Sequence, residues 1–380
     1  MTDSPSLRPA HRDRHAVRVR LTVLLGVVLA LLLSACSAEP GATGAMLSPS
    51  PSPSPTPSAT PSPSPTPSPS PTPPPPPPPP PPAPAPPPPV HPLTGAGPVP
   101  TSAVVAVKID NSPLARPYHR GLGEAALVYQ EVMEGGATRF LAVYSPAIGS
   151  EVGPIRSMRE ADVELLTQFG RIPLGASGAN RDVLVAFRKA EAEGQLLDAN
   201  YETVKAPYRL GERRKDARNF FAAPAALDIA KPGGTWPKDI GLRFGPLPPG
   251  VGTPAARARV RFSTLSDATV EYDPASGRYA VFNEGQRLLG AAPANVVVQY
   301  VKVRETAYVD VLGNRTPYTE TVGGGGVVLL RDGVQLAGGW ARGSRAEGTR
   351  LFDVTQAPLP LKPGPTWFLL VPEGRPLRVG

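Results

Sequence analysis

Cysteine and histidine are both scarce in this chain. Its 380 residues include one cysteine, Cys36, and four histidines. A single thiol cannot close a disulfide within the chain, so the fold must depend on its hydrophobic core. Three histidines precede the globular part, which keeps only His119. The sequence therefore excludes a histidine-rich zinc site and gives no support to a Ser-His-Asp or Cys-His nucleophile. We predict no cofactor and no metal, although a calcium site built from carboxylates stays open.

A hydrophobic run long enough to cross a membrane is also missing. The apolar stretch at residues 21–33 has about 13 residues, whereas a membrane-spanning helix needs roughly 20. Five arginines precede it, and Leu33-Ser34-Ala35-Cys36 ends it with a pattern that resembles the lipobox of bacterial lipoproteins. We predict that residues 1–35 are a signal peptide and that Cys36 receives diacylglycerol and further acyl chains such as palmitate. The protein would then be lipid-anchored on the extracytoplasmic face of the cell membrane. The alternative is an ordinary signal peptide with an incidental cysteine.

The chain has only a small excess of positive charge once the signal peptide is set aside. The formal net charge is +8, and residues 1–35 supply five arginines against two acids, Asp3 and Asp13. More than a third of the excess therefore leaves with the signal peptide. The remainder gives no case for a nucleic-acid partner, but it permits attraction to anionic lipid or to wall polymers.

Residues 36–92 contain almost nothing that a core could bury. Pro-Ser and Pro-Thr repeats fill 49–72, an unbroken proline run fills 73–82, and Pro-Ala repeats continue to 89. Such a composition cannot offset the entropy of ordering and favours extended polyproline II. We predict a disordered linker that acts as a semi-rigid spacer between the membrane and the folded part.

Residues 93–247 are predicted to form a layered α/β domain. A Ser-x-x-Glu capping pattern at Ser157 predicts one helix start, and Asn180 is expected to cap a second helix running to Glu193. A nearly continuous apolar run at 104–109 predicts a strand that is covered on both faces. Residues 126–132 alternate loosely, and residues 138–145 are also predicted to form a strand.

Residues 255–380 are predicted to form a mostly-β domain after a Pro- and Gly-rich boundary at 246–254. Asp332-Gly333 is a strong signal for a hairpin turn. The predicted fold class is therefore α+β, with the helices in the first domain. The short strands expected in the second domain are 257–263, 269–272, 278–283, 295–304, 326–331, 335–341 and 366–371.

An anion site is predicted where arginines gather at the first helix start. Arg156, Ser157 and Arg159 lie where free backbone N–H groups and the helix dipole attract anions. Guanidinium groups there add bidentate donors for carboxylate or phosphate, and Arg139 is expected to join them. The alternative is that these arginines pair internally with acids of the same region. Those acids are Glu131, Glu134, Glu160 and Asp162.

Four further polar residues are predicted to orient or transform a ligand. Glu131 and Glu134 could act as general acid and base, because paired carboxylates suit glycoside chemistry. Asp110 and Asn111 end the first strand and would lie near them if the first strands are adjacent. Acids near turns are common, so whether the chain is an enzyme stays open.

Several motifs of the folded part stand out in combination. They are Val107-Lys108-Ile109-Asp110-Asn111, Ala115-Arg116-Pro117, Gly121-Leu122, Glu134-Gly135-Gly136-Ala137-Thr138-Arg139-Phe140, Gly153-Pro154-Ile155-Arg156-Ser157-Met158-Arg159, Asn295-Val296-Val297-Val298-Gln299, Gly338-Gly339-Trp340 and Pro363-Gly364-Pro365-Thr366-Trp367. Together they resemble the motifs of the YerB-like bacterial lipoproteins, a family catalogued as a domain of unknown function. The resemblance covers roughly residues 92–375 and implies a lipoprotein with an N-terminal α/β part and a C-terminal β part. It implies no activity.

The sequence thus favours a membrane-tethered envelope lipoprotein that binds an anionic ligand, either a wall polymer or its precursor. One alternative is an envelope glycan hydrolase or transferase that uses Glu131 and Glu134. Another is a non-catalytic assembly partner of a second envelope protein.

Overall fold

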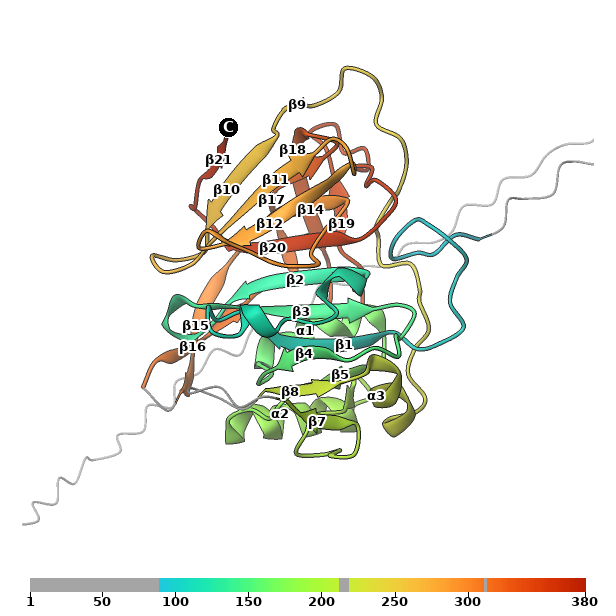
Figure 1. The fold of residues 1–380 in the computed structure, drawn as a ribbon, viewed down its shortest axis with the longest axis vertical. Coiled ribbons are helices and arrows are strands. Elements are labelled where there is room, and N and C mark those ends of the chain that lie inside the picture. The colour runs from blue at the N-terminus through green and yellow to red at the C-terminus, as the bar shows by residue number, and fades with distance from the viewer. Residues whose placement is uncertain (1–88, 212–218, 311–312) are drawn as a thin grey trace, which may run out of the picture. The chain divides into compact units, whose positions relative to one another are not determined.

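The computed structural model describes residues 89–211, 219–310 and 313–380, which belong to one compact unit (Figure 1). These residues are mostly β, with few helices and several sheets. No helix among them is long and apolar enough to span a membrane. The predicted signal peptide, Cys36 and nearly all of the predicted linker lie outside the described residues.

The helices of the described residues all lie in the first half of the folded part, before the boundary that the sequence predicts at 246–254, as expected. The α-helices are α1 (Glu160–Leu166), α2 (Arg181–Ala192) and α3 (Pro224–Ala230). The short 3-10 helices are Arg116–Tyr118, Leu122–Glu124, Glu134–Gly136 and Thr167–Phe169.

The largest sheet contains strands from both halves of the folded part, before and after the predicted boundary. Its strands from the first half are β1 (Val105–Asp110), β2 (Leu127–Val132), β3 (Thr138–Tyr144), β4 (Val152–Ile155), β5 (Pro173–Gly175), β6 (Leu197–Asp198), β7 (Tyr208–Leu210) and β8 (Phe220–Ala222). Those from the second half are β9 (Thr253–Pro254), β14 (Asn295–Val301), β17 (Gly323–Arg331), β18 (Val334–Arg342), β19 (Arg350–Phe352) and β20 (Thr366–Pro372).

This sheet crosses the boundary that the sequence predicts at 246–254. Its order along the described strands is β19-β18-β17-β14-β20-β2-β3-β1-β4-β8-β7, with β5 beside β1, β6 beside β5 and β9 beside β18. The two halves join where β20 runs parallel to both β14 and β2, and Figure 1 shows β20, in red, beside β2. The strands of both halves thus share one sheet, and the division into two layered domains stays a prediction.

A second sheet and a separate strand pair complete the described strands. The second sheet has the order β13-β12-β11-β10-β21, and the strand pair is antiparallel. The strands of the second sheet are β10 (Arg257–Arg261), β11 (Asp267–Asp273), β12 (Arg278–Asn283), β13 (Gln286–Arg287) and β21 (Leu377–Val379). The pair is β15 (Val303–Val309) and β16 (Arg315–Thr319).

The main sheet is covered on both faces, which explains its continuous apolar runs. On β1, Val105 and Val107 pack in a cluster that includes buried residues of β10, β11 and β12. Ala106, between them, packs in the other cluster, which includes residues of α1 and α2. All six residues of β1 are buried. Because side chains alternate between faces, Lys108 falls on the same face as Ala106.

Two of the predicted local signals are confirmed. Asn180 caps α2, and its side chain accepts a hydrogen bond from the Val183 N–H at 2.8 Å. Asp332 and Gly333 turn β17 into β18 with φ angles of 52° and 75°, the positive values that this hairpin turn requires. The capping prediction at Ser157 is wrong in position, because α1 begins at Glu160.

Candidate functional site

A cavity of about 540 Å³ opens where β1 ends and β3 begins. Its wall comes from five stretches of chain that are far apart in sequence. The lining residues are Asp110, Ser112, Met133, Glu134, Ala137, Thr138, Arg139, Arg156, Ser157, Arg159, Ala179, Asn180, Val183, Val309 and Asp310. Six of the eight residues predicted from the sequence as ligand-binding or catalytic therefore meet here, and Asn111 and Glu131 do not.

Strand register places Arg139 at the centre of a polar row. Arg139 on β3 lies opposite Asp110 on β1 and opposite Glu131 on β2. Residues directly opposite in antiparallel strands project from the same face. The strands that carry Asp110 and Glu131 are both neighbours of β3 and are not neighbours of each other. The guanidinium of Arg139 thus lies between two carboxylate-bearing strands.

Arg159 is held by a two-pronged pair with Glu134. Its Nε and Nη2 donate to Oε1 and Oε2 of Glu134, each at 2.7 Å. Thr316 on β16 also donates to Glu134, at 2.8 Å. Burial raises the pKa of Glu134, but the hydrogen bond and charge of Arg159, with smaller help from Thr316, hold that pKa below its usual value. Glu134 is therefore ionised and suited to positioning Arg159, whereas a general acid must carry a proton.

Arg156 faces Asp110 at the edge of the cavity. Its Nε lies 3.2 Å from Oδ2 of Asp110, close enough for an ion pair although the N–H is not aligned for a hydrogen bond. Asp110 also accepts the backbone N–H of Ser112 at 3.0 Å. The hydroxyl of Ser112 is buried and has no hydrogen-bond partner among the described residues. It is a donor that a ligand could use.

Arg139 differs from the other two arginines because no carboxylate of the described residues lies at ion-pair distance from it. Its Nη1 donates to the carbonyl oxygen of Ser157 at 3.0 Å, and this oxygen also accepts from Arg159 at 3.3 Å. Burial and the neighbouring Arg159 and Arg156 lower the pKa of Arg139 to about 9, against the opposing influence of Asp110 and Glu134. An anion in the cavity would relieve this repulsion.

The helix start does not supply the backbone donors that the sequence predicts. The N–H of Arg159 donates to Oδ2 of Asp162 at 2.7 Å, so α1 caps itself. The N–H groups of Arg156 and Met158 donate to the carbonyl oxygens of Lys108 and Gly178, at 2.9 and 3.0 Å. The anion site therefore depends on side chains and not on the helix terminus.

Glu131 belongs to a separate, buried cluster and does not line the cavity. It pairs with Lys108, whose Nζ also lies 2.6 Å from Oδ1 of Asp162. All three side chains are at least 97% buried, and burial lowers the pKa of Lys108 to about 8 although Asp162 opposes the shift. A carboxylate enclosed in this way cannot reach a glycan. The predicted catalytic pair of Glu131 and Glu134 is therefore not brought together in the cavity.

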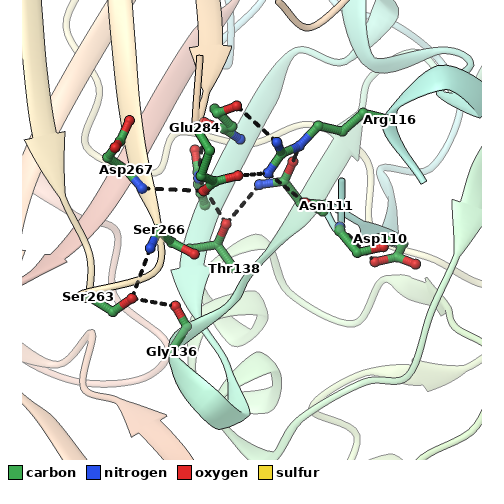
Figure 2. A network of polar contacts seen from close by, with 12 residues as sticks. Asp110, Asn111, Arg116, Gly136, Thr138, Ser263, Ser266, Asp267 and Glu284 are labelled. Atoms are coloured by element: carbon green, nitrogen blue, oxygen red, sulfur yellow. Dashed lines mark hydrogen bonds and ion pairs between the residues drawn. The ribbon is translucent and has the colours of Figure 1, made fainter. Parts of the chain in front are cut away.

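Asn111 faces a polar network between the two sheets (Figure 2). Its amide donates to the hydroxyl of Thr138 at 2.7 Å and accepts from Nε of Arg116 at 3.1 Å. Arg116 in turn pairs with Glu284 and donates to the carbonyl of Asn283 at 2.9 Å. Asn111 thus joins β1 to the end of β12, and the predicted role in orienting a ligand does not fit its position.

Sequence reasoning missed several polar residues at or near the cavity, among them Ser112, Asp310 and Asn219. Ser112 follows the Asp110-Asn111 signal directly and could have been included with it. Asp310 follows β15 in the second half of the chain, so only the tertiary fold brings it here. Asn219 precedes Phe220, which pairs with Ile155, the residue before Arg156. Its amide is fully buried with no hydrogen-bond partner among the described residues.

No group of three histidine, cysteine or acidic side chains within the described ranges is arranged to hold a metal ion. The chemistry that the site offers is therefore that of three guanidiniums, two of them fixed by carboxylates. Such a site binds planar or tetrahedral oxyanions.

Comparisons with known proteins agree with the resemblance noted in the sequence. A curated relative, "Putative lipoprotein YerB" of Bacillus subtilis (strain 168), is 44% identical over 68 residues, or 18% of this chain and 20% of that protein. The aligned part thus spans about a fifth of the relative's length. The crystal structure of YerB from Bacillus subtilis matches with a TM-score of 0.61 and 23% identity, over 76% of this chain and 99% of that one, which shows a common fold.

Two family descriptions match the chain in sequence order. "Protein of unknown function (DUF3048) N-terminal domain" matches residues 93–233, and the corresponding C-terminal domain matches residues 258–368. Together the two matches cover more than half of the chain. The chain therefore belongs to the DUF3048 family of proteins of unknown function.

Proposed function

We propose that this protein is a lipoprotein, tethered through Cys36 to the extracytoplasmic face of the cell membrane, that binds an anionic group of the cell envelope. The ligand would be a wall polymer or its precursor. The relative named as a lipoprotein supports the tether, and the lipobox-like pattern supports Cys36 as its site. The arginine-lined cavity supports the ligand class.

The observation that carries this proposal is the position of Arg139. Three guanidiniums converge on one cavity, and Arg159 and Arg156 already have carboxylates beside them. Arg139 has a backbone carbonyl as its acceptor and two cationic neighbours. A carboxylate or phosphate entering the cavity would give Arg139 a charged partner without breaking the pairs that hold the other two.

The surrounding groups have distinct roles in this proposal. Glu134 fixes the Arg159 fork, and Thr316 fixes Glu134 from the second half of the chain. Asp110 orients Arg156, and Ser112 offers a hydroxyl. Preorganised donors of this kind bind an anion with little further ordering.

Binding is better supported than glycan hydrolysis. Hydrolysis needs two carboxyl groups on either side of the scissile bond, one of them protonated. Glu131 is enclosed with Lys108, and Glu134 is held ionised by Arg159. The two residues therefore do not supply the protonated acid that the reaction needs beside a second carboxylate.

A binding experiment on the full-length protein in detergent tests the proposal. The variant is Arg139→Gln, and the control is Arg243→Gln, which removes an exposed arginine paired with Asp239. Cosedimentation is measured with purified bacterial cell walls before and after extraction of their anionic polymers. We expect Arg139→Gln to weaken binding about tenfold or more, as for loss of a charge-assisted hydrogen bond, and the control to bind like the wild type.

Two outcomes would contradict the proposal. If the wild type binds extracted and intact walls equally, the ligand is not anionic polymer. If Arg139→Gln and Arg243→Gln bind alike, the cavity is not the site, and the role of assembly partner for another envelope protein gains support.

A further inference from the structure

We infer that the edge of the second sheet holds a site for a phosphate group, separate from the Arg139 cavity. Arginine side chains line a hollow of about 230 Å³ at β10 and β21, together with Pro376. The proposed function uses none of them. These arginines are Arg259, Arg261, Arg375 and Arg378.

Strand pairing brings two of these like charges face to face. Arg259 on β10 lies directly opposite Arg378 on β21. Buried and exposed residues alternate along β10, so Arg259 and Arg261 both lie on its exposed face. Like charges directly opposite in a sheet destabilise it. An anion that bridges the guanidiniums would turn this repulsion into attraction.

The acids nearby do not neutralise the cluster. Asp267 pairs with Arg259 at 2.6 Å. For Arg261, Arg375 and Arg378, no carboxylate of the described chain lies at ion-pair distance. The difference is local, because Arg257 on the same face of β10 pairs with Glu271 at 2.9 Å. Three positive charges therefore gather without partners around a concave surface.

The chemistry of the hollow fits a phosphate group. Guanidinium forks donate two parallel hydrogen bonds to phosphate oxygens, and several forks can share one tetrahedral anion. The hollow is small, so it suits a single phosphate group. That group could belong to a soluble phosphate polymer or to a lipid headgroup. The competing explanation is that charges on the edge strand β21 prevent it from pairing with another sheet.

A double variant, Arg261→Gln with Arg378→Gln, tests the inference in the full-length protein. Inorganic pyrophosphate is titrated by calorimetry, and Arg257→Gln is the matched control on the same strand face. We expect the double variant to bind at least about tenfold more weakly and the control to bind like the wild type. The comparison is made in the Arg139→Gln background, which takes the place of the wild type in this titration, because the Arg139 cavity is itself proposed to take phosphate.

A second measurement identifies the source of the phosphate and separates the two explanations. If the wild type cosediments with phosphatidylglycerol vesicles and the double variant does not, the phosphate belongs to a lipid headgroup. If the wild type does not bind vesicles and poly(glycerol phosphate) competes with pyrophosphate, the phosphate belongs to a polymer. Equal pyrophosphate affinity in the wild type and the double variant overturns the inference, as does an equal loss in Arg257→Gln. If the double variant keeps its pyrophosphate affinity but begins to self-associate, the arginines instead prevent the edge strand β21 from pairing with another sheet.

Discussion

Two charged clusters lie side by side, each built in part from β1, and they differ in their access to solvent. The buried cluster is Lys108, Glu131 and Asp162, and its ammonium contacts both carboxylates. The cavity cluster opens onto a space of about 540 Å³. Its members are Asp110, Glu134, Arg139, Arg156 and Arg159.

The comparison shows how charge on one sheet face can serve two purposes. In the buried cluster each charged group has an opposite charge in contact, as burial demands. In the cavity cluster Arg139 keeps only a neutral acceptor, Ser157, among the described residues. The two clusters also influence each other, because Arg159 and Arg139 both lower the pKa of Lys108. We therefore expect the buried cluster to control stability and the open cluster to control binding.

The largest effect should follow from Lys108→Met. The change leaves Glu131 and Asp162 buried without their counter-ion, and the expected loss is about 3–5 kcal/mol of the free energy of unfolding. Urea denaturation at pH 7 measures it. Lys189→Met is the control, because Lys189 is 75% exposed and lies 3.7 Å from Glu193. If Lys108→Met loses no more unfolding free energy than the control, the buried cluster does not stabilise the fold as expected.

A smaller loss is expected from Arg159→Gln. This change removes both hydrogen bonds to Glu134, whose side chain is 9% exposed, and should cost about 1–3 kcal/mol. Arg243→Gln removes a similar pair with Asp239, whose side chain is 62% exposed, and should cost less than about 0.5 kcal/mol. Comparing the two losses of unfolding free energy tests whether burial, and not pair geometry, determines how much each arginine stabilises the fold. Equal losses would contradict that explanation.

The strands of both clusters were predictable because local patterns determine them. The predicted strand segments 104–109, 126–132 and 138–145 correspond to β1, β2 and β3. The apolar run at 104–109 is typical of a strand that is covered on both faces. The sequence also predicted that Arg139 would join Arg156 and Arg159, although the helix-start donors on which that prediction rested are already bonded within the chain.

The partners of these residues were not predictable from local patterns. The order β2-β3-β1 sets the row of Asp110, Arg139 and Glu131, and nothing in the three segments specifies that order. Thr316 reaches Glu134 across 182 residues. The internal pairing that the sequence left open as an alternative is present for Arg159, and it coexists with an open cavity.

Acid should expose the contribution of Glu134. Its pKa is lower in the folded protein than in the unfolded chain, so it stabilises the fold above its unfolded pKa of about 4.3 and loses that contribution as the pH falls through the folded pKa. Glu134→Gln should therefore be less stable than the wild type at pH 7, by about 1 kcal/mol. The difference should shrink below pH ~4, as followed by urea denaturation across pH. A constant difference would mean that the ionised form of Glu134 is not what stabilises the fold.

The smallest effect on stability should come from Arg139→Gln, although it should have the largest effect on binding. Burial and two cationic neighbours lower the pKa of Arg139, so at pH 7 its charge is less favourable in the folded protein than in the unfolded chain. Removing that charge offsets the loss of the hydrogen bond to Ser157, and the unfolding free energy should change by less than about 0.5 kcal/mol. Urea denaturation beside the cell-wall assay measures both quantities on one sample. A large loss of stability would make Arg139 a member of the structural cluster and erase the contrast between the two.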